Sequence, residues 1–419
     1  MAQTPRSLGW QLGMSAYWFA TSMKWFVMLI TLAFVVNELV PGGSEGRSWG
    51  FVVLVGGSWA MIGPGLFGYL SDRTRGKWGR WKPYLAIGCA GTCLALMFLA
   101  NAKSYSVVIV GYLLLQISDD LATGPYSMLI PSLVPEEQRG RASGIMGLMQ
   151  FSAQLVAGVV SIVIGSIVPI YATVAGVSVA CALITLMTVK EEPAERVSDR
   201  VGFVEGWITP WRDHDFKWAW ITRFLNALGF YLVITYLGLY FLNVVKEFTA
   251  FGVTFASVSG MTTASAAAQK AVIMVALLIS TCAAIGTVIA GRAADKIGRK
   301  RVIYLCGTAM AIALVPFALF PNFQLIILLA VVFGLGYGAY ESSNWALVSD
   351  VLPSQDDVAK DMGIWQSSIA APQVVAGLLG LVVDIKDVHG VSGFGIVFIC
   401  AAAAYFVSTF LVRMIRGSR

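Results

Sequence analysis

The sequence predicts an all-α membrane protein that crosses the bilayer twelve times, as two pseudo-repeated bundles of six helices. The composition is 57% hydrophobic and only 12% charged, whereas soluble chains are about half apolar and about a quarter charged. Apolar runs of about 20 residues, long enough to span hydrocarbon, recur along all 419 residues. The two halves of the chain also carry the same landmarks in the same order.

The twelve apolar runs are separated by Gly, Pro and charged residues, which set their borders. They cover residues 11–37, 48–70, 84–102, 105–130, 142–166, 168–189, 217–245, 270–291, 302–320, 322–348, 362–383 and 393–413. The first run is too long for a signal peptide and has no small-residue cleavage site after it. We therefore expect it to be a retained first helix.

Basic residues indicate the direction of the spans, because Lys and Arg are retained on the cytoplasmic side. Lys24 and Arg223 lie within spans, and most of the other 27 lie in the termini and in the loops on one side. The five that we assign to the outside are Arg47, Lys103, Lys246, Lys270 and Lys386. We therefore expect an integral protein of the inner cell membrane with both termini in the cytoplasm. The net charge of +6 is explained by basic residues that flank the membrane helices beside anionic lipid head groups. It therefore does not indicate a nucleic-acid partner.

The longest charged stretch lies midway along the chain and contains Pro193 and Pro210. We predict an N-terminal six-helix bundle at residues 1–189, a cytoplasmic linker at 190–217 and a C-terminal six-helix bundle at 218–419. The outside segment at 246–270 is long and rich in Ser, Thr, Ala and Gly. It predicts either a mobile flap or a frayed helix end.

The halves share three landmarks near their fifth spans, as parallel repeats of a transporter should. Pro135, Gly144 and Gln154 recur as Pro353, Gly363 and Gln373. The offset is 218 residues at the prolines and 219 at the other two.

A second shared feature lies between the second and third spans of each half. A glycine stands four residues before an aspartate, and a basic, glycine-containing loop follows. Such a glycine lets neighbouring helices approach closely, and the aspartate can pair with basic residues or a facing helix end. We predict a conformational latch made of Gly68, Asp72, Arg73, Gly79, Arg80, Gly291, Asp295, Gly298 and Arg299.

These paired loops resemble the signature loop of the major facilitator superfamily. The longer first-half loop, at residues 71–83, resembles those of the glycoside-pentoside-hexuronide:cation symporters and the sucrose:proton symporters. The segment from Gly124 to Arg141 is also similar to the sucrose branch. The resemblance covers essentially the whole chain. It implies that two halves rock about a central cavity lined by the first, fourth, seventh and tenth helices.

Five ionisable residues fall inside the predicted spans, all on those four helices: Lys24, Asp119, Asp120, Arg223 and Glu341. Each costs several kcal/mol in the bilayer unless it is paired or hydrated. Three acids and two bases leave one carboxyl without a cation. We predict that Asp119 or Asp120, with Glu341 as second choice, carries a coupling proton. The two cations would then tune it or bind substrate, and the alternative is static salt bridging.

The chain departs from the resembling families at two places. Melibiose-type symporters have a pair of acids on the second helix for sodium, and the second span here, Ser48 to Leu70, has none. The sucrose branch tends to have an acid where this chain has Gln116. The first departure argues against a sodium site and favours proton coupling or simple facilitation. The second makes direct transfer of a proton site unsafe.

Aromatic and planar polar side chains on the predicted cavity helices favour a sugar, because rings stack on its C–H surface and amides bind its hydroxyls. Trp18 and Trp25 stand seven residues apart, with Tyr17 and Lys24 beside them. The candidate substrate-binding residues are Tyr17, Trp18, Lys24, Trp25, Gln116, Arg223, Asn226, Tyr231, Asn344 and Trp345. Further polar contacts could come from Gln150, Gln154, Gln366 and Gln373.

The favoured partner is therefore a small-molecule substrate, a sugar or glycoside moved with a proton. An organic anion such as a uronate is the first alternative, since Lys24 and Arg223 would suit a carboxylate. Export of lipophilic compounds is the second. A membrane sensor or assembly partner without transport is a different class of function.

The sequence contains no nucleophile and base set, metal cluster or phosphate loop, so we expect no enzyme, cofactor or metal. Two histidines, His214 and His389, fall in predicted loops. All six cysteines lie in apolar segments, where a thiol acts as a small hydrophobe. They are Cys89, Cys93, Cys181, Cys282, Cys306 and Cys400.

Overall fold

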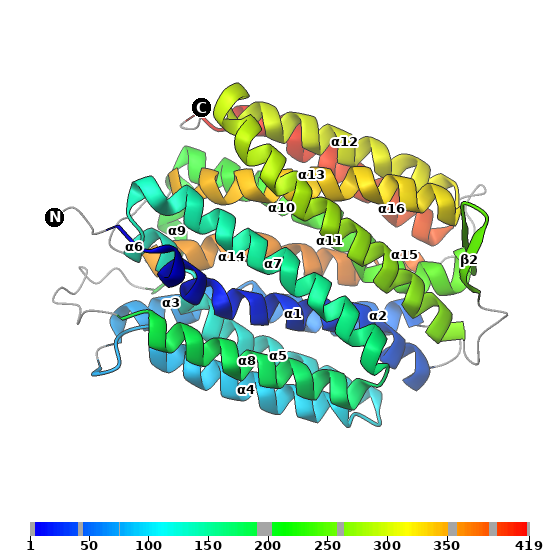
Figure 1. Cartoon of the computed structure of the whole chain (residues 1–419), viewed down its shortest axis with the longest axis horizontal. Coiled ribbons are helices and arrows are strands. Elements are labelled where there is room, and N and C mark those ends of the chain that lie inside the picture. The colour runs from blue at the N-terminus through cyan, green and yellow to red at the C-terminus, as the bar shows by residue number, and fades with distance from the viewer. Residues whose placement is uncertain are drawn as a thin grey trace.

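The computed structural model describes residues 5–40, 45–74, 76–190, 203–257, 264–350, 358–384 and 392–416. Over these residues twelve helical spans are long and apolar enough to cross a membrane, which confirms the predicted all-α membrane fold. The spans form one elongated bundle (Figure 1). The start of α1 and the end of α16 lie at one end of it, named here the terminal end, and strand β2 lies at the other, the hairpin end.

The first six spans contain eight helices. They are α1 (Leu8–Leu39), α2 (Glu45–Ala60) with α3 (Gly63–Arg73), α4 (Lys82–Ala100), α5 (Tyr105–Tyr126) with α6 (Leu129–Leu133), α7 (Glu136–Ile164) and α8 (Ile167–Thr188). Local sequence marks several ends. The side chains of Ser7 and Ser104 accept hydrogen bonds from the first turns of α1 and α5, as N-cap residues do. The second span, predicted as continuous, is broken at Gly63 and Pro64, because proline lacks the N–H that would continue the helix.

Between the two groups of spans lie α9 (Phe203–Ile208) and the 3₁₀ helix η1 (Thr209–Arg212). Both fall in the stretch predicted as a linker, of which residues 191–202 lie outside the described part. The last six spans are α10 (His214–Tyr240) with the π-helix η2 (Phe241–Val245), α11 (Ala264–Ile297), α12 (Arg299–Leu319), α13 (Phe323–Asp350), α14 (Val358–Leu378) with α15 (Gly380–Val383), and α16 (Gly393–Leu411) with the 3₁₀ helix η3 (Val412–Met414).

A β-hairpin follows the seventh span, where the sequence predicted a flap or a frayed helix end. Strands β1 (Glu247–Ala250) and β2 (Val253–Ser257) pair antiparallel, with Ala250 opposite Val253. The two turn residues, Phe251 and Gly252, both have positive φ, as a tight hairpin turn requires. On β1, the buried Phe248 packs on Phe323, with ring centroids 5.2 Å apart. The hairpin therefore packs on the N-terminal end of α13. Residues 258–263 lie outside the described part.

Glycines hold the two groups of spans together where α14 crosses the second span. A Cβ at Gly377 would lie 2.5 Å from the backbone oxygen of Gly50, and one at Gly363 would lie 2.7 Å from the Cα of Gly65. Larger side chains at these positions would push the helices apart. Elsewhere α7 packs on α11 across the same boundary, while α4 packs on α5 and α8, and α11 on α13, within each group.

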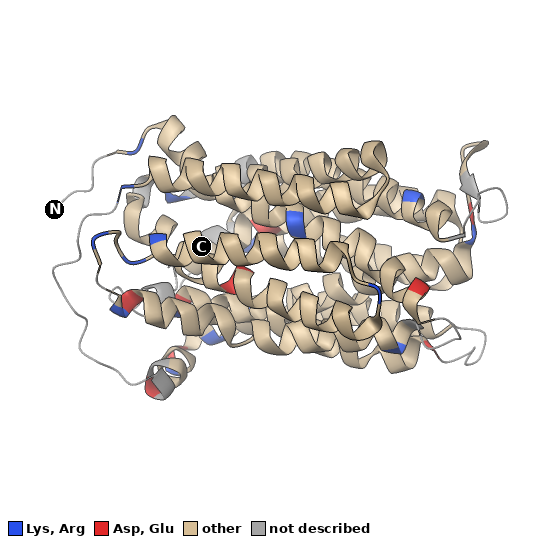
Figure 2. Ribbon diagram, turned by 90° about the horizontal axis from the view of Figure 1, so that it is seen from below, with Lys and Arg blue, Asp and Glu red and all other residues tan. Residues whose placement is uncertain are grey.

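Charged residues gather at the two ends of the bundle and leave its middle largely apolar, apart from a few buried positions (Figure 2). This distribution suits helices whose middles lie in hydrocarbon and whose ends meet water. The few central charges define the candidate site.

Close backbone packing makes a stability prediction. A Cβ at Gly338 of α13 would overlap the backbone oxygen of Ala283 in α11, so Gly338→Ala should destabilise the protein by about 1–3 kcal/mol through overpacking. Gly176→Ala, in α8, is the matched control, since nothing lies within 4 Å of its added methyl. Thermal unfolding in nanodiscs measures both. Equal melting temperatures for the two variants would contradict the close α11–α13 approach.

Candidate functional site

A cavity of about 260 Å³ lies between the two groups of spans. Its wall combines α1, the end of α2, α3, α5 and α7 of the first group with α10, α11, α13 and α14 of the second. The resemblance had assigned the lining to the first, fourth, seventh and tenth spans. The structure adds the second, fifth, eighth and eleventh, so each group contributes four spans.

A self-contained ion pair lies beside this cavity, between α1 and α5. The Asp119 carboxylate accepts hydrogen bonds from Lys24 Nζ, from Thr21 Oγ1 at 2.8 Å and from Trp25 Nε1 at 2.6 Å. Lys24 is 1% exposed, and Asp119 is also buried. Asp119 lines the cavity, whereas Lys24 does not. The pair thus neutralises itself, with both carboxylate oxygens occupied.

The neighbouring Asp120 has a different environment, because adjacent helical residues point about 100° apart. Its Oδ1 accepts a hydrogen bond from Gln116 Nε2 at 3.1 Å. Its buried Oδ2 has no hydrogen-bond partner in the part of the chain that the structure describes, and neither has Trp59 Nε1. A Cβ at Gly63 would lie 2.6 Å from this Oδ2 and 2.7 Å from Trp59 Nε1. An open acceptor and an open donor therefore face the break in the second span.

The second group of spans contributes one cation and one acid to the cavity wall. The Arg223 guanidinium lies over the Trp365 ring, 3.2 Å from its centroid, and Nη1 donates to Gln366 Oε1 at 3.4 Å. Glu341 lines the cavity from α13, and the positive charge of Arg223 acts on its carboxylate. Stacking on an indole stabilises a desolvated guanidinium by cation–π attraction. Arg223 is thus held on the wall by its flat face.

Six of the ten predicted substrate-binding residues line the cavity. They are Trp18, Trp25, Gln116, Arg223, Asn226 and Tyr231. Trp18 is fixed on both sides, since its ring stacks on Tyr126 with centroids 6.3 Å apart and its Nε1 donates to Gln150 Oε1 at 3.2 Å. The four additional glutamines, Gln150, Gln154, Gln366 and Gln373, also line it.

Three of the other four predicted residues lie outside the cavity lining, and the fourth is not described. Lys24 is behind the wall, bound to Asp119. Tyr17 packs edge-on against Tyr126 at 5.8 Å, and Asn344 is 4% exposed; neither belongs to the cavity lining. The side chain of Trp345 lies outside the described part of the structure. Tyr17 precedes Trp18 by one position, and that rotation of about 100° turns it into the first bundle.

The sequence reasoning missed several lining residues, among them Thr21, Phe230, Ser280 and Tyr337. Thr21 had a signal, because it stands one turn before Trp25 on the same helix face. Phe230 and Tyr337 stack with centroids 4.9 Å apart, but aromatic residues in an apolar run look the same whether they face lipid or a cavity.

The predicted latch in the first half reaches across the boundary between the two groups. Asp72 Oδ2 accepts a hydrogen bond from the backbone N of Lys360, in the first turn of α14, at 3.3 Å. Arg73 lies over the ring of Tyr69, Gly68 is buried, and the Arg80 backbone oxygen accepts from Ser71 Oγ at 3.2 Å. The acidic side chain therefore lies at a helix N-terminus, where negative charge is favourable.

Gly79 and Gly298 occupy corresponding loops, and both have positive φ, at 86° and 89°. Only glycine adopts this conformation freely, which explains the repeated glycine. In the second-half latch, the surroundings of Gly291 and the side chains of Asp295 and Arg299 lie outside the described part of the structure.

A sequence-family model described as MFS/sugar transport protein matches residues 12–405. The chain belongs to this family. The predicted membership of the major facilitator superfamily is thereby confirmed, and the protein is a membrane transporter and not an enzyme. A comparison with curated protein sequences found no match.

Three solved structures, of two transporters, share the fold across nearly their whole length. A mutant of the nucleoside transporter NupG has a TM-score of 0.69 and 17% identity, covering 97% of this chain and 100% of that one. The unmutated NupG has a TM-score of 0.63 and 16% identity, and the match covers 97% of this chain and 99% of that one. A bacterial homologue of the human lysosomal transporter Spinster, inward-facing and unoccupied, has a TM-score of 0.62 and 14% identity, and the match covers 98% of each chain. At these identities the likeness shows the fold alone.

The buried ion pair makes a stability prediction. Lys24→Met leaves the Asp119 carboxylate buried without its cation, so it should destabilise the protein by about 3–5 kcal/mol. Adding Asp119→Asn removes the stranded charge and should restore a large part of the loss. Lys103→Met, at an exposed position, is the control and should change little. Thermal melting of the wild type, both single variants, the double variant and the control measures the coupling; additive losses in the double variant would contradict the pair.

Proposed function

We propose that the protein carries a small neutral polyhydroxylated solute, a sugar being favoured, together with a proton, by exposing the central cavity to each side of the membrane in turn. The observation that carries the proposal is the composition of the cavity wall. Six carboxamide side chains and two indoles line it, beside one buried carboxylate oxygen that has no hydrogen-bond partner among the described residues.

The carboxamides support a polyhydroxylated solute because each offers both donors and an acceptor. They come from both groups of spans: Gln116, Gln150, Gln154, Asn226, Gln366 and Gln373. A solute bound between them would contact both groups at once. Trp18 and Trp25 add flat apolar faces for the C–H surface of a sugar ring.

The volume and charge of the cavity favour a compact neutral solute. At about 260 Å³ it lies just below the roughly 300–1,000 Å³ of ordinary ligand pockets, which favours a single sugar ring. Lys24 is already bound to Asp119, and among the described lining residues Arg223 is the cation that shares the wall with Asp120 and Glu341. This excess of acids disfavours a uronate, and the polar lining disfavours a lipophilic export substrate.

Asp120 is the favoured proton carrier. The Asp119 carboxylate accepts three hydrogen bonds, whereas the buried Oδ2 of Asp120 accepts none from the described residues. An ionised carboxylate with an unsatisfied oxygen is costly away from water, so a proton relieves it. Glu341 is the second choice, because the positive charge of Arg223 stabilises its ionised form and so disfavours binding of a proton. The second span supplies Ala60 and Pro64 but no acid to the described cavity lining, which favours a proton over sodium.

Alternating access requires that contacts at one end of the bundle break while those at the other form. We place the terminal end in the cytoplasm of a cell membrane, and the division between the halves in the linker at 190–217. The hydrogen bond of Asp72 to α14 then acts as a cytoplasmic latch. Its loss would accompany opening of the cavity to that side.

Proton coupling is tested in proteoliposomes loaded with a pH dye and challenged with sugars, glycosides, uronates and carboxylates. One sugar class should drive proton entry. Asp120→Asn, which mimics the protonated carboxyl, should abolish uphill uptake and leave solute counterflow intact. Glu247→Gln, an exposed acid on the hairpin, is the control and should transport normally.

Other outcomes decide against parts of the proposal. Uphill uptake that survives Asp120→Asn would exclude Asp120 as the carrier. Solute equilibration without proton movement would make the protein a facilitator. A response to uronates alone would favour the organic-anion alternative, and no transport of any compound would favour a sensor or assembly role.

The carboxamide contacts make a separate prediction about affinity. Gln373→Leu removes a cavity-lining amide and leaves a solute hydroxyl unpaired, a loss of about 1–3 kcal/mol, so the KM should rise by roughly 5- to 150-fold. Gln324→Leu, at an exposed position on α13, should leave the KM unchanged. Uptake of the best sugar over a concentration range measures both. An unchanged KM in Gln373→Leu would exclude this amide from binding.

A further inference from the structure

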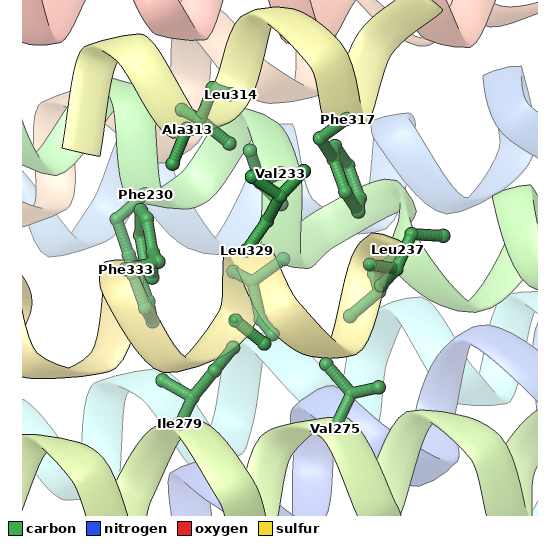
Figure 3. Close-up of a pocket in the computed structure, with 13 residues that line it drawn as sticks. Phe230, Val233, Leu237, Val275, Ile279, Ala313, Leu314, Phe317, Leu329 and Phe333 are labelled. Atoms are coloured by element: carbon green, nitrogen blue, oxygen red, sulfur yellow. The ribbon is translucent and has the colours of Figure 1, made fainter. Parts of the chain in front are cut away.

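A second, smaller cavity lies inside the last group of spans, between α10, α11, α12 and α13. Its volume is about 50 Å³, and every side chain that lines it is Phe, Val, Ile, Leu or Ala. Figure 3 shows Val233, Val275, Ala313, Phe317 and Leu329 reaching into one space from the four helices. We name this space the apolar side pocket.

The apolar side pocket adjoins the central cavity. Three residues, Phe230, Ile234 and Ile279, line both spaces. Phe230 forms part of the shared wall and stacks on Tyr337, itself a lining residue of the central cavity. The residues shared by the two spaces are all apolar. Apolar side chains therefore form the boundary between a solute in the central cavity and the side pocket.

The side of the pocket formed by α12 and part of α13 is lined by buried side chains. Ala313, Leu314 and Phe317 of α12 are 4–6% exposed, and Ile326 and Ala330 of α13 are 1% and 5% exposed. Entry from the bilayer would have to pass these packed side chains. The central cavity, which shares three lining residues with the pocket, is thus the shorter route.

Water gains little in this pocket. A buried water needs two to four polar partners, and the lining side chains offer none. Apolar cavities of this kind stay dry and take apolar guests; one of about 150 Å³ accepts benzene. A space about a third as large suits a short alkyl group.

We propose that the apolar side pocket receives an apolar substituent of the transported solute, so that the preferred ligands are short-chain alkyl glycosides. The sugar ring occupies the central cavity, and the alkyl chain passes Phe230 and Ile279 into the side pocket. This inference rests on the proposed sugar transport and narrows its substrate class.

The test is a homologous series of methyl, ethyl, propyl, butyl and hexyl glycosides of the best-transported sugar, measured as competitors of its uptake. Affinity should rise about fourfold with each added methylene and level off once the pocket is full. Ala313→Leu adds carbon atoms to the pocket and should abolish this rise while uptake of the unsubstituted sugar continues. Ala403→Leu, the same change at an exposed site on α16, should keep the rise.

The outcomes separate this inference from the proposed function. If the sugar is transported but the series is flat, or Ala313→Leu and Ala403→Leu behave alike, the pocket is a packing void only and the inference is overturned. If no sugar is transported, the proposed function fails. In that case a series of alkyl glucosides from methyl to hexyl, measured as thermal stabilisation of the protein in nanodiscs, decides the pocket, and the absence of any chain-length dependence overturns the inference.

Discussion

The charges in the middle of the spans must find their partners inside the protein, because hydrocarbon supplies none. Lys24 and Asp119 satisfy this constraint together, with Thr21 and Trp25 completing the carboxylate's hydrogen bonds. The pair ties α1 to α5 in the core of the first bundle. Because both carboxylate oxygens of Asp119 are occupied, we propose its neighbour Asp120 as the carboxyl that carries the coupling proton. The Lys24–Asp119 pair thus orders this part of the first group of spans.

Much of the fold could be predicted from the sequence, since hydropathy and the Gly, Pro and charged residues between apolar runs are local signals. The twelve spans follow from them, and the family follows from the paired loops after the second span of each half. The break in the second span was foreseeable from Gly63 and Pro64, yet the apolar run concealed it. The hairpin was not foreseeable, because its turn uses Phe251 and Gly252 in place of the Asn-Gly or Asp-Gly that marks such turns.

The candidate site was predictable as a set of residue types and less so as a geometry. Buried charges stand out against apolar runs, and five of them identified the region. Which of the two adjacent acids is paired depends on the rotation of α5 about its axis and on the position of α1. Both are features of tertiary packing, and the sequence of one helix does not specify them. Tyr17 and Asn344 look like lining residues in sequence, but tertiary packing turns them away from the cavity. The stacking of Arg223 on Trp365 joins residues 142 positions apart, a pairing that no local pattern predicts.

The crossing of α14 over the second span has a mechanical consequence. At Gly50 with Gly377, and at Gly65 with Gly363, the two backbones approach closely because neither glycine carries a Cβ. Interlocked side chains resist rotation because they must leave their holes before the helices can turn. These glycine contacts place few interlocking atoms between the helices. Any turning of one group of spans against the other would therefore meet less steric resistance here than at a contact between large side chains.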